Sequence, residues 1–361
     1  MAPDAHIRID GRAGRITLDR AQALNALTHQ VCIDTLAALD AWEGDERVRL
    51  VILDAVGQRA FCAGGDIAYM HAAMQRDDPG AGRRFWHDEY RMNARLAGYP
   101  KPIVSFLHGY VMGGGVGFGC HASHRVVGES ARVAMPECAI GLIPDTGGSH
   151  LLARAPGRLG LYLGLTGARM GPGDAIHAGF ADHHIPEADW PPLIAALCAD
   201  GDVRRLDQAA LPAPDSPLAA RAPAIDTAID AAFAPSGVAE ALARLAASPT
   251  GWAQDAAAAL RRASPLCLVG AARVIASAEA AASIQSALRQ EYRWTWRSLD
   301  QGDFAEGIRA QIIDRDHAPR WAHATLFDVP DAEVAAMLAP LGADELTFDA
   351  DTHDTDTEEP R

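Results

Sequence analysis

The spacing of hydrophobic residues divides the chain into an N-terminal part of alternating strands and helices and a C-terminal part of helices. Residues 6–18 alternate apolar and polar side chains around two glycines, which predicts a β-hairpin. Helical spacing predicts a helix over 28–43, and the apolar run at 50–53 predicts a buried strand. The alternation continues with predicted helices at 67–76 and 84–97 and predicted strands at 102–106, 125–127 and 132–134. This alternation indicates α/β architecture.

The pattern changes near residue 187, beyond which Ala and Leu recur at helical spacing. We therefore predict an α/β core over 1–187 and a mainly α-helical region over 188–345. Residues 346–361 are predicted to form an acidic tail that frays.

Composition narrows the possible functions. The 361 residues are 49% hydrophobic and carry a formal net charge of -15, which disfavours nucleic acid as a partner. No apolar stretch is long enough for a transmembrane helix, and the N-terminus lacks a signal-peptide pattern, so we expect no membrane association and a cytoplasmic location. The six cysteines are scattered without a C-x-x-C pair, which predicts free buried thiols in a reducing compartment.

Two glycine-rich segments are candidates for ligand contacts through the backbone. In residues 61–67, Gly64 and Gly65 can let an N–H face a ligand, and Asp66 is a good N-cap for the next helix. The glycine run within 108–119 would open a helix and offer unpaired N–H donors. A tight turn in the first segment and close helix packing in the second explain the same residues. Packing is the preferred explanation for the outer glycines of the run, Gly117 and Gly119.

A third segment, residues 135–148, places Glu137 and Asp145 among apolar, Pro and Gly residues. Burial would raise the pKa of such carboxyl groups and suit them to acid/base or nucleophilic work. The alternative is that each carboxylate caps a helix or pairs with an Arg.

Other patterns carry less chemistry. His121, His124 and the pair 183–184 lack a third ligand at metal-site spacing, so no metal site is predicted. The absence of G-x-S-x-G disfavours a serine hydrolase. Trp294 and Trp296 could stack on an adenine or pack between helices.

The order and spacing of the three segments resemble the crotonase (enoyl-CoA hydratase/isomerase) superfamily. Its members show a Cys/Ala-Ala-Gly-Gly/Ala-Asp loop, a Gly-Gly-Gly loop and helix, and a Pro-Glu segment. The resemblance implies an α/β, crotonase-like spiral of ββα units followed by a mainly helical C-terminal domain. It also implies that the N–H groups of Gly65 and Gly114 form an oxyanion hole around a thioester carbonyl.

Further matches resemble the hydroxyisobutyryl-CoA hydrolase branch, and they lie at 140–145, 165–169, 290–293, 303–310, 313–316 and 319–321. Hydratases of the superfamily use two glutamates, and Gly117 stands at the first of these positions. The resemblance implies Glu137 and Asp145 as catalytic residues and Glu89 in the acyl pocket, where it accepts a hydrogen bond from a substrate hydroxyl. Arg20 stands where relatives hold Asn-Arg-Pro near the CoA phosphates, but the Asn and Pro are absent.

The implied activity is hydrolysis of a short branched 3-hydroxyacyl-CoA such as 3-hydroxyisobutyryl-CoA, in valine breakdown. Glu137 would either attack the carbonyl or activate water, and both routes stay open. No cofactor beyond the CoA of the substrate is expected, and homo-oligomerisation is left open. The alternatives are an enoyl-CoA hydratase or Δ3-Δ2 isomerase, and a catalytically silent binding member of the fold.

Overall fold

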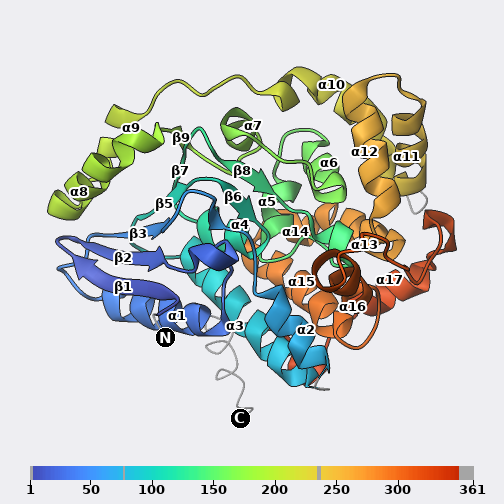
Figure 1. Cartoon of the computed structure of the whole chain (residues 1–361), viewed down its shortest axis with the longest axis horizontal. Helices are drawn as coiled ribbons and strands as arrows, with labels where there is room; N and C mark the ends of the chain where they lie inside the picture. Colours follow the sequence, from blue (N-terminus) through green and yellow to red (C-terminus); the bar gives the residue numbers. More distant parts are fainter. Residues whose placement is uncertain (1–2, 76–77, 234–236, 349–361) are drawn as a thin grey trace, which may run out of the picture.

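The computed structural model describes residues 3–75, 78–233 and 237–348 of the chain (Figure 1). The predicted acidic tail lies almost entirely outside the described residues. The architecture is α/β, with two sheets surrounded by helices.

The larger sheet has six strands in the order β1-β2-β3-β5-β7-β9, and only β1 and β2 pair antiparallel. Its strands are β1 (Ala5–Asp10), β2 (Ala13–Leu18), β3 (Leu50–Ala55), β5 (Ile103–Leu107), β7 (His124–Val127) and β9 (His183–His184). The predicted hairpin and the predicted strands in β3, β5 and β7 are confirmed. Strand β5 is buried along its whole length, Ser105 included, as is usual for a parallel strand covered by helices on both faces.

A smaller parallel sheet consists of β4 (Ala60–Cys62), β6 (Tyr110–Met112) and β8 (Arg132–Ala134). Strand β8 was predicted, whereas β4 and β6 lie in the two glycine-rich segments, where no strand was predicted. Strands of three residues are too short to show a period of two, and β6 lies directly beside the glycine run.

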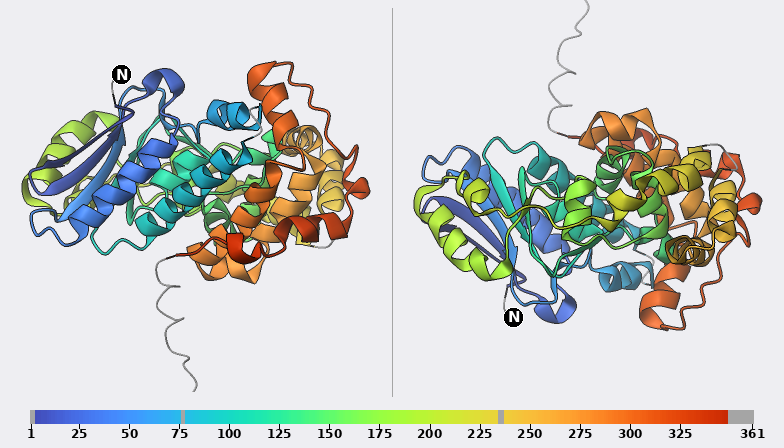
Figure 2. Two further views of the ribbon diagram at one scale, coloured as in Figure 1. Left: turned by 90° about the horizontal axis from the view of Figure 1, so that it is seen from below. Right: turned by 90° about the horizontal axis from the view of Figure 1, so that it is seen from above.

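Helices cover both faces of the larger sheet (Figure 2). One face carries α1 (His29–Glu43) and α3 (Pro79–Ala97), and the other carries α8 (Trp190–Asp200). Helix α3 begins earlier than predicted because Asp78 caps it by accepting the N–H of Ala81. The remaining helices near the sheets are α2 (Ile67–Gln75), α4 (Gly114–Gly119), α5 (Gly148–Ala153), α6 (Leu159–Thr166), α7 (Pro172–His177) and α9 (Arg205–Ala209).

The predicted helical character of the second half is also seen. Its helices are α10 (Pro217–Ile229), α11 (Gly237–Ala247), α12 (Gly251–Arg262), α13 (Pro265–Ile275), α14 (Ala278–Ala282), α15 (Ile284–Ser298), α16 (Phe304–Ile308) and α17 (Asp331–Leu338). Helix α15 packs against α3, and one hydrophobic cluster joins residues of both halves. A division of the chain at residue 187 stays a prediction.

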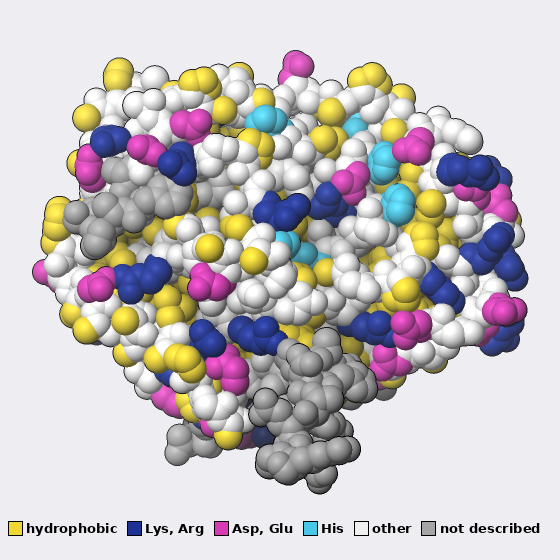
Figure 3. All heavy atoms as spheres, turned by 180° about the vertical axis from the view of Figure 1, so that it is seen from behind, with side chains coloured by type: hydrophobic (Ala, Val, Ile, Leu, Met, Phe, Trp, Pro, Cys, Tyr) yellow, Lys and Arg dark blue, Asp and Glu magenta, His cyan; other side chains and the backbone are white. Residues whose placement is uncertain are grey.

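All six cysteines are buried and form no disulfide, which confirms the predicted free buried thiols. Within the described ranges, no helix is both long and apolar enough to cross a membrane. On the face shown in Figure 3, acidic and basic side chains are interspersed.

Candidate active site

The predicted site residues line one small cavity beneath α2 and α3. Its volume is about 90 Å³. It brings together Gly65, Gly114, Glu89, Glu137 and Asp145. The other walls are apolar or backbone, from Ala63, Gly64, Ile67, Met70, Phe85, Trp86, Met112, Gly113, Pro136, Ile140, Leu142 and Thr146. Typical small-molecule sites measure roughly 300–1,000 Å³, so this cavity suits a short acyl group.

The two glycine loops meet at the cavity. A Cβ atom on Gly114 would lie 3.1 Å from the amide nitrogen of Gly65 and 2.6 Å from Oε1 of Glu89. Gly65 forms a β-bridge with Leu27, in which the Leu27 N–H donates to the Gly64 carbonyl and the Asp66 N–H donates to the Leu27 carbonyl. The Gly65 N–H takes no part in this bridge. Gly114 is the first residue of α4, so its N–H has no partner within the helix. The two N–H groups can therefore reach one carbonyl oxygen in the cavity.

Glu137 opens a short 3-10 helix, η2 (Glu137–Ile140), directly after Pro136. The helix ends at Gly141, whose φ of 76° is unfavourable for other residues. The Glu137 side chain is buried, and its Oε2 has no hydrogen-bond partner among the described residues. A Cβ atom on Gly113 would lie 2.7 Å from the Oε1 atom of Glu137. The carboxylate therefore faces the glycine loop and is free to take a new partner.

Asp145 lies on the loop before α5, and Tyr90 of α3 orients it. The Tyr90 hydroxyl donates to Oδ2 of Asp145 over 2.7 Å. The next residue, Thr146, has a φ of 56°, which is strained for a threonine. Its hydroxyl donates to the Gly113 carbonyl over 3.3 Å, so the Asp145 loop is tied to the α4 loop.

Glu291 of α15 supports the same loop from the C-terminal half of the chain. Its carboxylate accepts the N–H of Gly147 over 2.7 Å and the N–H of Ser149 over 3.0 Å. The Ser149 hydroxyl donates to it as well. These bonds hold a loop whose backbone includes two successive left-handed residues, Thr146 and Gly147.

Burial changes the protonation of the carboxyl groups in the cavity. Desolvation raises the pKa of Asp145 to about 7, although the Tyr90 hydroxyl opposes this shift. Desolvation, followed by the charge of Asp145, raises the pKa values of Glu89 and Glu137 well above their ordinary range. At neutral pH the cluster therefore keeps protons, so a carboxylate and a carboxylic acid can act side by side.

Residue 117 has no room for an acidic side chain. A Cβ atom on Gly117 would lie 2.6 Å from the Thr146 Cβ atom and 2.9 Å from Nδ2 of Asn93. The packing explanation is confirmed for Gly119 as well, where a Cβ atom would lie 2.6 Å from a Leu107 methyl group. The glycine run within 108–119 does open a helix, α4, which ends at Gly119.

Other candidate residues have structural roles. Asp66 caps α2 by accepting the Tyr69 N–H over 3.1 Å, as predicted. Arg20 pairs with Asp66 at 3.0 Å and with Asp4 at 3.3 Å. Trp294 is buried, and its ring fills the space beside Gly270, so packing accounts for it.

The sequence analysis gave no site role to three residues that hold Asp145 and its loop: Tyr90, Thr146 and Glu291. Tyr90 follows Glu89 directly, but no local pattern shows that it reaches a loop 55 residues away. Among the described residues, no group of three or more His, Cys, Asp or Glu side chains could hold a metal.

The chain is similar to known proteins over most of its length. Residues 13–338 match the family described as Enoyl-CoA hydratase/isomerase. The chain is similar to the mitochondrial 3-hydroxyisobutyryl-CoA hydrolases of Xenopus tropicalis, at 35% identity over 93% of this chain and 89% of the relative, and of Gallus gallus, at 33% identity over 96% and 91%.

Two solved structures share the whole fold. One is described as an enoyl-CoA hydratase from Rhodobacter sphaeroides, with 54% identity, a TM-score of 0.90, and coverage of 96% of this chain and 100% of that one. The other is described as a carnitinyl-CoA dehydratase from Mycobacterium thermoresistibile, with 42% identity, a TM-score of 0.89, and coverage of 96% and 99%. On its motifs, its fold and these matches, the chain belongs to the enoyl-CoA hydratase/isomerase (crotonase) family of enzymes.

Proposed function

We propose that this protein hydrolyses the thioester of a short branched 3-hydroxyacyl-CoA, and that 3-hydroxyisobutyryl-CoA from valine breakdown is its substrate. One observation carries the proposal. The second carboxylate of the cavity, Asp145, comes from the loop before α5, while position 117 on α4 has no room for one. Hydration of a double bond needs one group to activate water and another to protonate carbon. The hydrolase names of the relatives from Xenopus tropicalis and Gallus gallus support the same activity.

In the proposed reaction, the N–H groups of Gly65 and Gly114 stabilise the negative charge that forms on the thioester oxygen. Each such donor is typically worth about 3 kcal/mol in the transition state. Glu137 either attacks the carbonyl to give an anhydride that water opens, or takes a proton from an attacking water. In both routes the carbon–sulfur bond breaks, and the CoA sulfur leaves with a proton that Asp145 can supply.

A buried polar atom without a hydrogen-bond partner suggests how the cavity would select its substrate. Oε1 of Glu89 is buried without a partner among the described residues. A substrate 3-hydroxyl group could donate to it and remove the cost of an unsatisfied acceptor, about 1–3 kcal/mol. The aromatic wall of Phe85 and Trp86 would contact the branched carbon.

The proposal needs no cofactor beyond the CoA part of the substrate, because backbone N–H groups and carboxylates supply the chemistry. A cytoplasmic location stays a prediction, and homo-oligomerisation stays open. The relatives carry mitochondrial names, which are statements about those proteins.

Enoyl-CoA hydration is the second candidate function, because the Rhodobacter sphaeroides structure is described as a hydratase. The deciding experiment incubates the purified chain separately with 3-hydroxyisobutyryl-CoA and with crotonyl-CoA. Free thiol and enoyl absorbance are measured for each. We expect thiol release from the first substrate and slow change in the second. Rapid loss of enoyl absorbance without thiol would make the protein a hydratase, and binding without either reaction would make it a silent member.

A further inference from the structure

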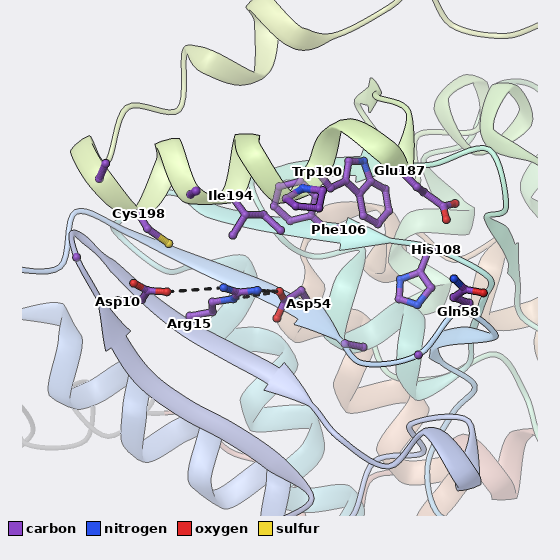
Figure 4. Close-up of a pocket in the computed structure, with 16 residues that line it drawn as sticks. Asp10, Arg15, Asp54, Gln58, Phe106, His108, Glu187, Trp190, Ile194 and Cys198 are labelled. Atoms are coloured by element: carbon purple, nitrogen blue, oxygen red, sulfur yellow. Dashed lines mark hydrogen bonds and ion pairs between the residues drawn. The ribbon is translucent and has the colours of Figure 1, made fainter.

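A second and larger cavity lies between α8 and the six-stranded sheet (Figure 4). Its volume is about 740 Å³, within the roughly 300–1,000 Å³ of typical small-molecule sites. Among the described residues, it shares no lining residue with the cavity of the three carboxylates. It is therefore a separate candidate site.

The sheet face that α8 covers changes from apolar to polar side chains toward the carboxyl ends of β3 and β5. Ile52 and Phe106 pack with α8 in an apolar cluster. Two residues beyond each of them on the same face come Asp54, near the end of β3, and His108, just after β5. The carboxyl ends of neighbouring parallel strands are a common place for ligand crevices. In Figure 4, Asp10, Arg15 and Asp54 lie in a row across the gap from α8.

The charged groups of the cavity leave an excess of negative charge. Among the described residues that line it, the carboxylates are those of Asp10, Asp54 and Glu187, and the one permanent cation is Arg15. Arg15 donates from Nε over 3.0 Å and from Nη2 over 2.5 Å to the same oxygen, Oδ2 of Asp54. Burial lowers the pKa of His108, so its imidazole adds no positive charge at neutral pH.

Two buried polar atoms at this cavity have no hydrogen-bond partner among the described residues. They are Oδ1 of Asp54 and Nε2 of His108, and as whole residues Asp54 and His108 are 8% and 6% exposed. Such groups cost about 1–3 kcal/mol when unsatisfied, so a ligand that donates hydrogen bonds would be stabilised. The aromatic rings of Phe106 and Trp190, with centroids 5.3 Å apart, offer an apolar surface beside them.

We propose that this cavity is a second binding site, for a small organic cation with an ammonium or guanidinium head and an apolar body. The head would donate to the carboxylates on the sheet side, since an ammonium group has donors and no acceptor. The body would lie against α8, where Ile194 and Trp190 face the gap. An organic anion of the same size would be repelled by the excess carboxylates.

The test uses the full chain and phenethylammonium as the probe, with 3-phenylpropionate as the anion of similar size. Isothermal titration should show the ammonium binding at least about tenfold more tightly, a factor worth about 1.4 kcal/mol. Equal binding of both probes, or of neither, would overturn the assignment of a cation site.

Variants place the binding in the cavity. Ala195→Trp fills it from α8 and should abolish binding, whereas Ala196→Trp, on the next residue and outside the lining, should leave binding unchanged. Asp54→Asn should weaken ammonium binding, and Asp10→Asn, at a more exposed carboxylate, tests the charge if the first variant melts early. Binding that survives Ala195→Trp, or that is lost only in the presence of an acyl-CoA, would show that the probe occupies another site.

Discussion

At the scale of single residues, the site depends on a few atoms whose surroundings decide their chemistry. Glu137 and Asp145 are ordinary acids in an extended chain. Burial raises the pKa values of both, and the charge of Asp145 raises that of Glu137 further. Tyr90 then adjusts Asp145 through one hydrogen bond.

Glu137→Gln is expected to remove thioester cleavage while CoA-ester binding persists, because an amide can act neither as nucleophile nor as base. Loss of a positioned acid/base group typically lowers the rate by about 10²–10⁴-fold. Steady-state thiol release and titration with the substrate measure the two effects. Glu279→Gln, at an exposed carboxylate of α14, is the matched control. A variant that keeps more than about a tenth of the rate, a barrier change under ~1.4 kcal/mol, would remove Glu137 from the mechanism.

Tyr90→Phe is expected to shift the pH dependence of kcat to higher pH. The hydroxyl donates to the Asp145 carboxylate and so lowers its pKa; without it, that pKa rises above its present value of about 7. A hydrogen bond to a charged group is worth about 1.5–3 kcal/mol, which corresponds to a shift of about one to two pH units.

The control is Tyr99→Phe, which removes a buried hydroxyl that donates to Leu39 away from the site. Tyr99→Phe loses this buried hydrogen bond, and Tyr90→Phe loses its bonds to Asp145 and Thr295, so both variants should melt earlier. Only Tyr90→Phe should move the pH profile, and an unmoved profile would mean that Asp145 does not titrate in the rate-determining step.

At the scale of elements, helix α4 and the loop before α5 pack so closely at Gly117 that α4 has no space for a side chain there. Gly117 of α4 meets Thr146, and Thr146 in turn donates to the Gly113 carbonyl. The loop that presents Asp145 is therefore packed into the place where a side chain on α4 would stand.

Gly117→Ala should destabilise the fold by about 1–3 kcal/mol, because the added methyl group overlaps with Thr146 and Asn93. Thermal or chemical unfolding measures the effect. Gly251→Ala, in α12, is the control, since nothing lies within 4 Å of its Cβ position. There the better helix propensity of Ala should leave stability unchanged or slightly higher. If Gly117→Ala were as stable as the control, the close packing of α4 and the loop would be refuted.

At the scale of the whole molecule, two long-range connections build the site. Helix α3 carries Glu89 into the cavity and Tyr90 to the Asp145 carboxylate. Helix α15 of the C-terminal half packs on α3 and holds the Asp145 loop through Glu291. The candidate active site therefore depends on both halves of the chain.

The buried carboxyl groups should make the whole fold less stable as pH rises. Folding raises the pKa of Asp145 from 3.8 to about 7 and that of Glu291 from 4.5 to about 8, chiefly by burial. A raised folded-state pKa contributes stability below the unfolded value, and that contribution is lost as pH rises through the folded value. Between about pH 5 and pH 8 the melting temperature should therefore fall.

Asp145→Asn should reduce this fall, because its neutral amide has no charge to bury, while exposed Glu279→Gln should not. Melting curves of the three proteins at both pH values check the prediction. A melting temperature of the wild-type protein that rises over this interval would show that these carboxyl groups are ionised without penalty in the fold.

The sequence by itself determined the local features. The hairpin, β3, β5 and α1 follow from apolar periods within single segments, and the glycine loops and Glu137 follow from short motifs. These succeed because a repeat of two or 3.6 residues reports the contacts of neighbours along the chain. The strands β4 and β6 were not predicted, because three residues are too few to show a periodic pattern.

Only the tertiary structure decided how distant residues meet. It joined Tyr90 to Asp145 across 55 positions and Ser149 to Glu291 across 142. It packed Thr146 against Gly117, and it set α8 over the sheet to form the second cavity. No period or motif encodes such contacts, because they arise when separate elements bury their apolar faces together, and the polar groups at the seams take whatever partners that packing leaves.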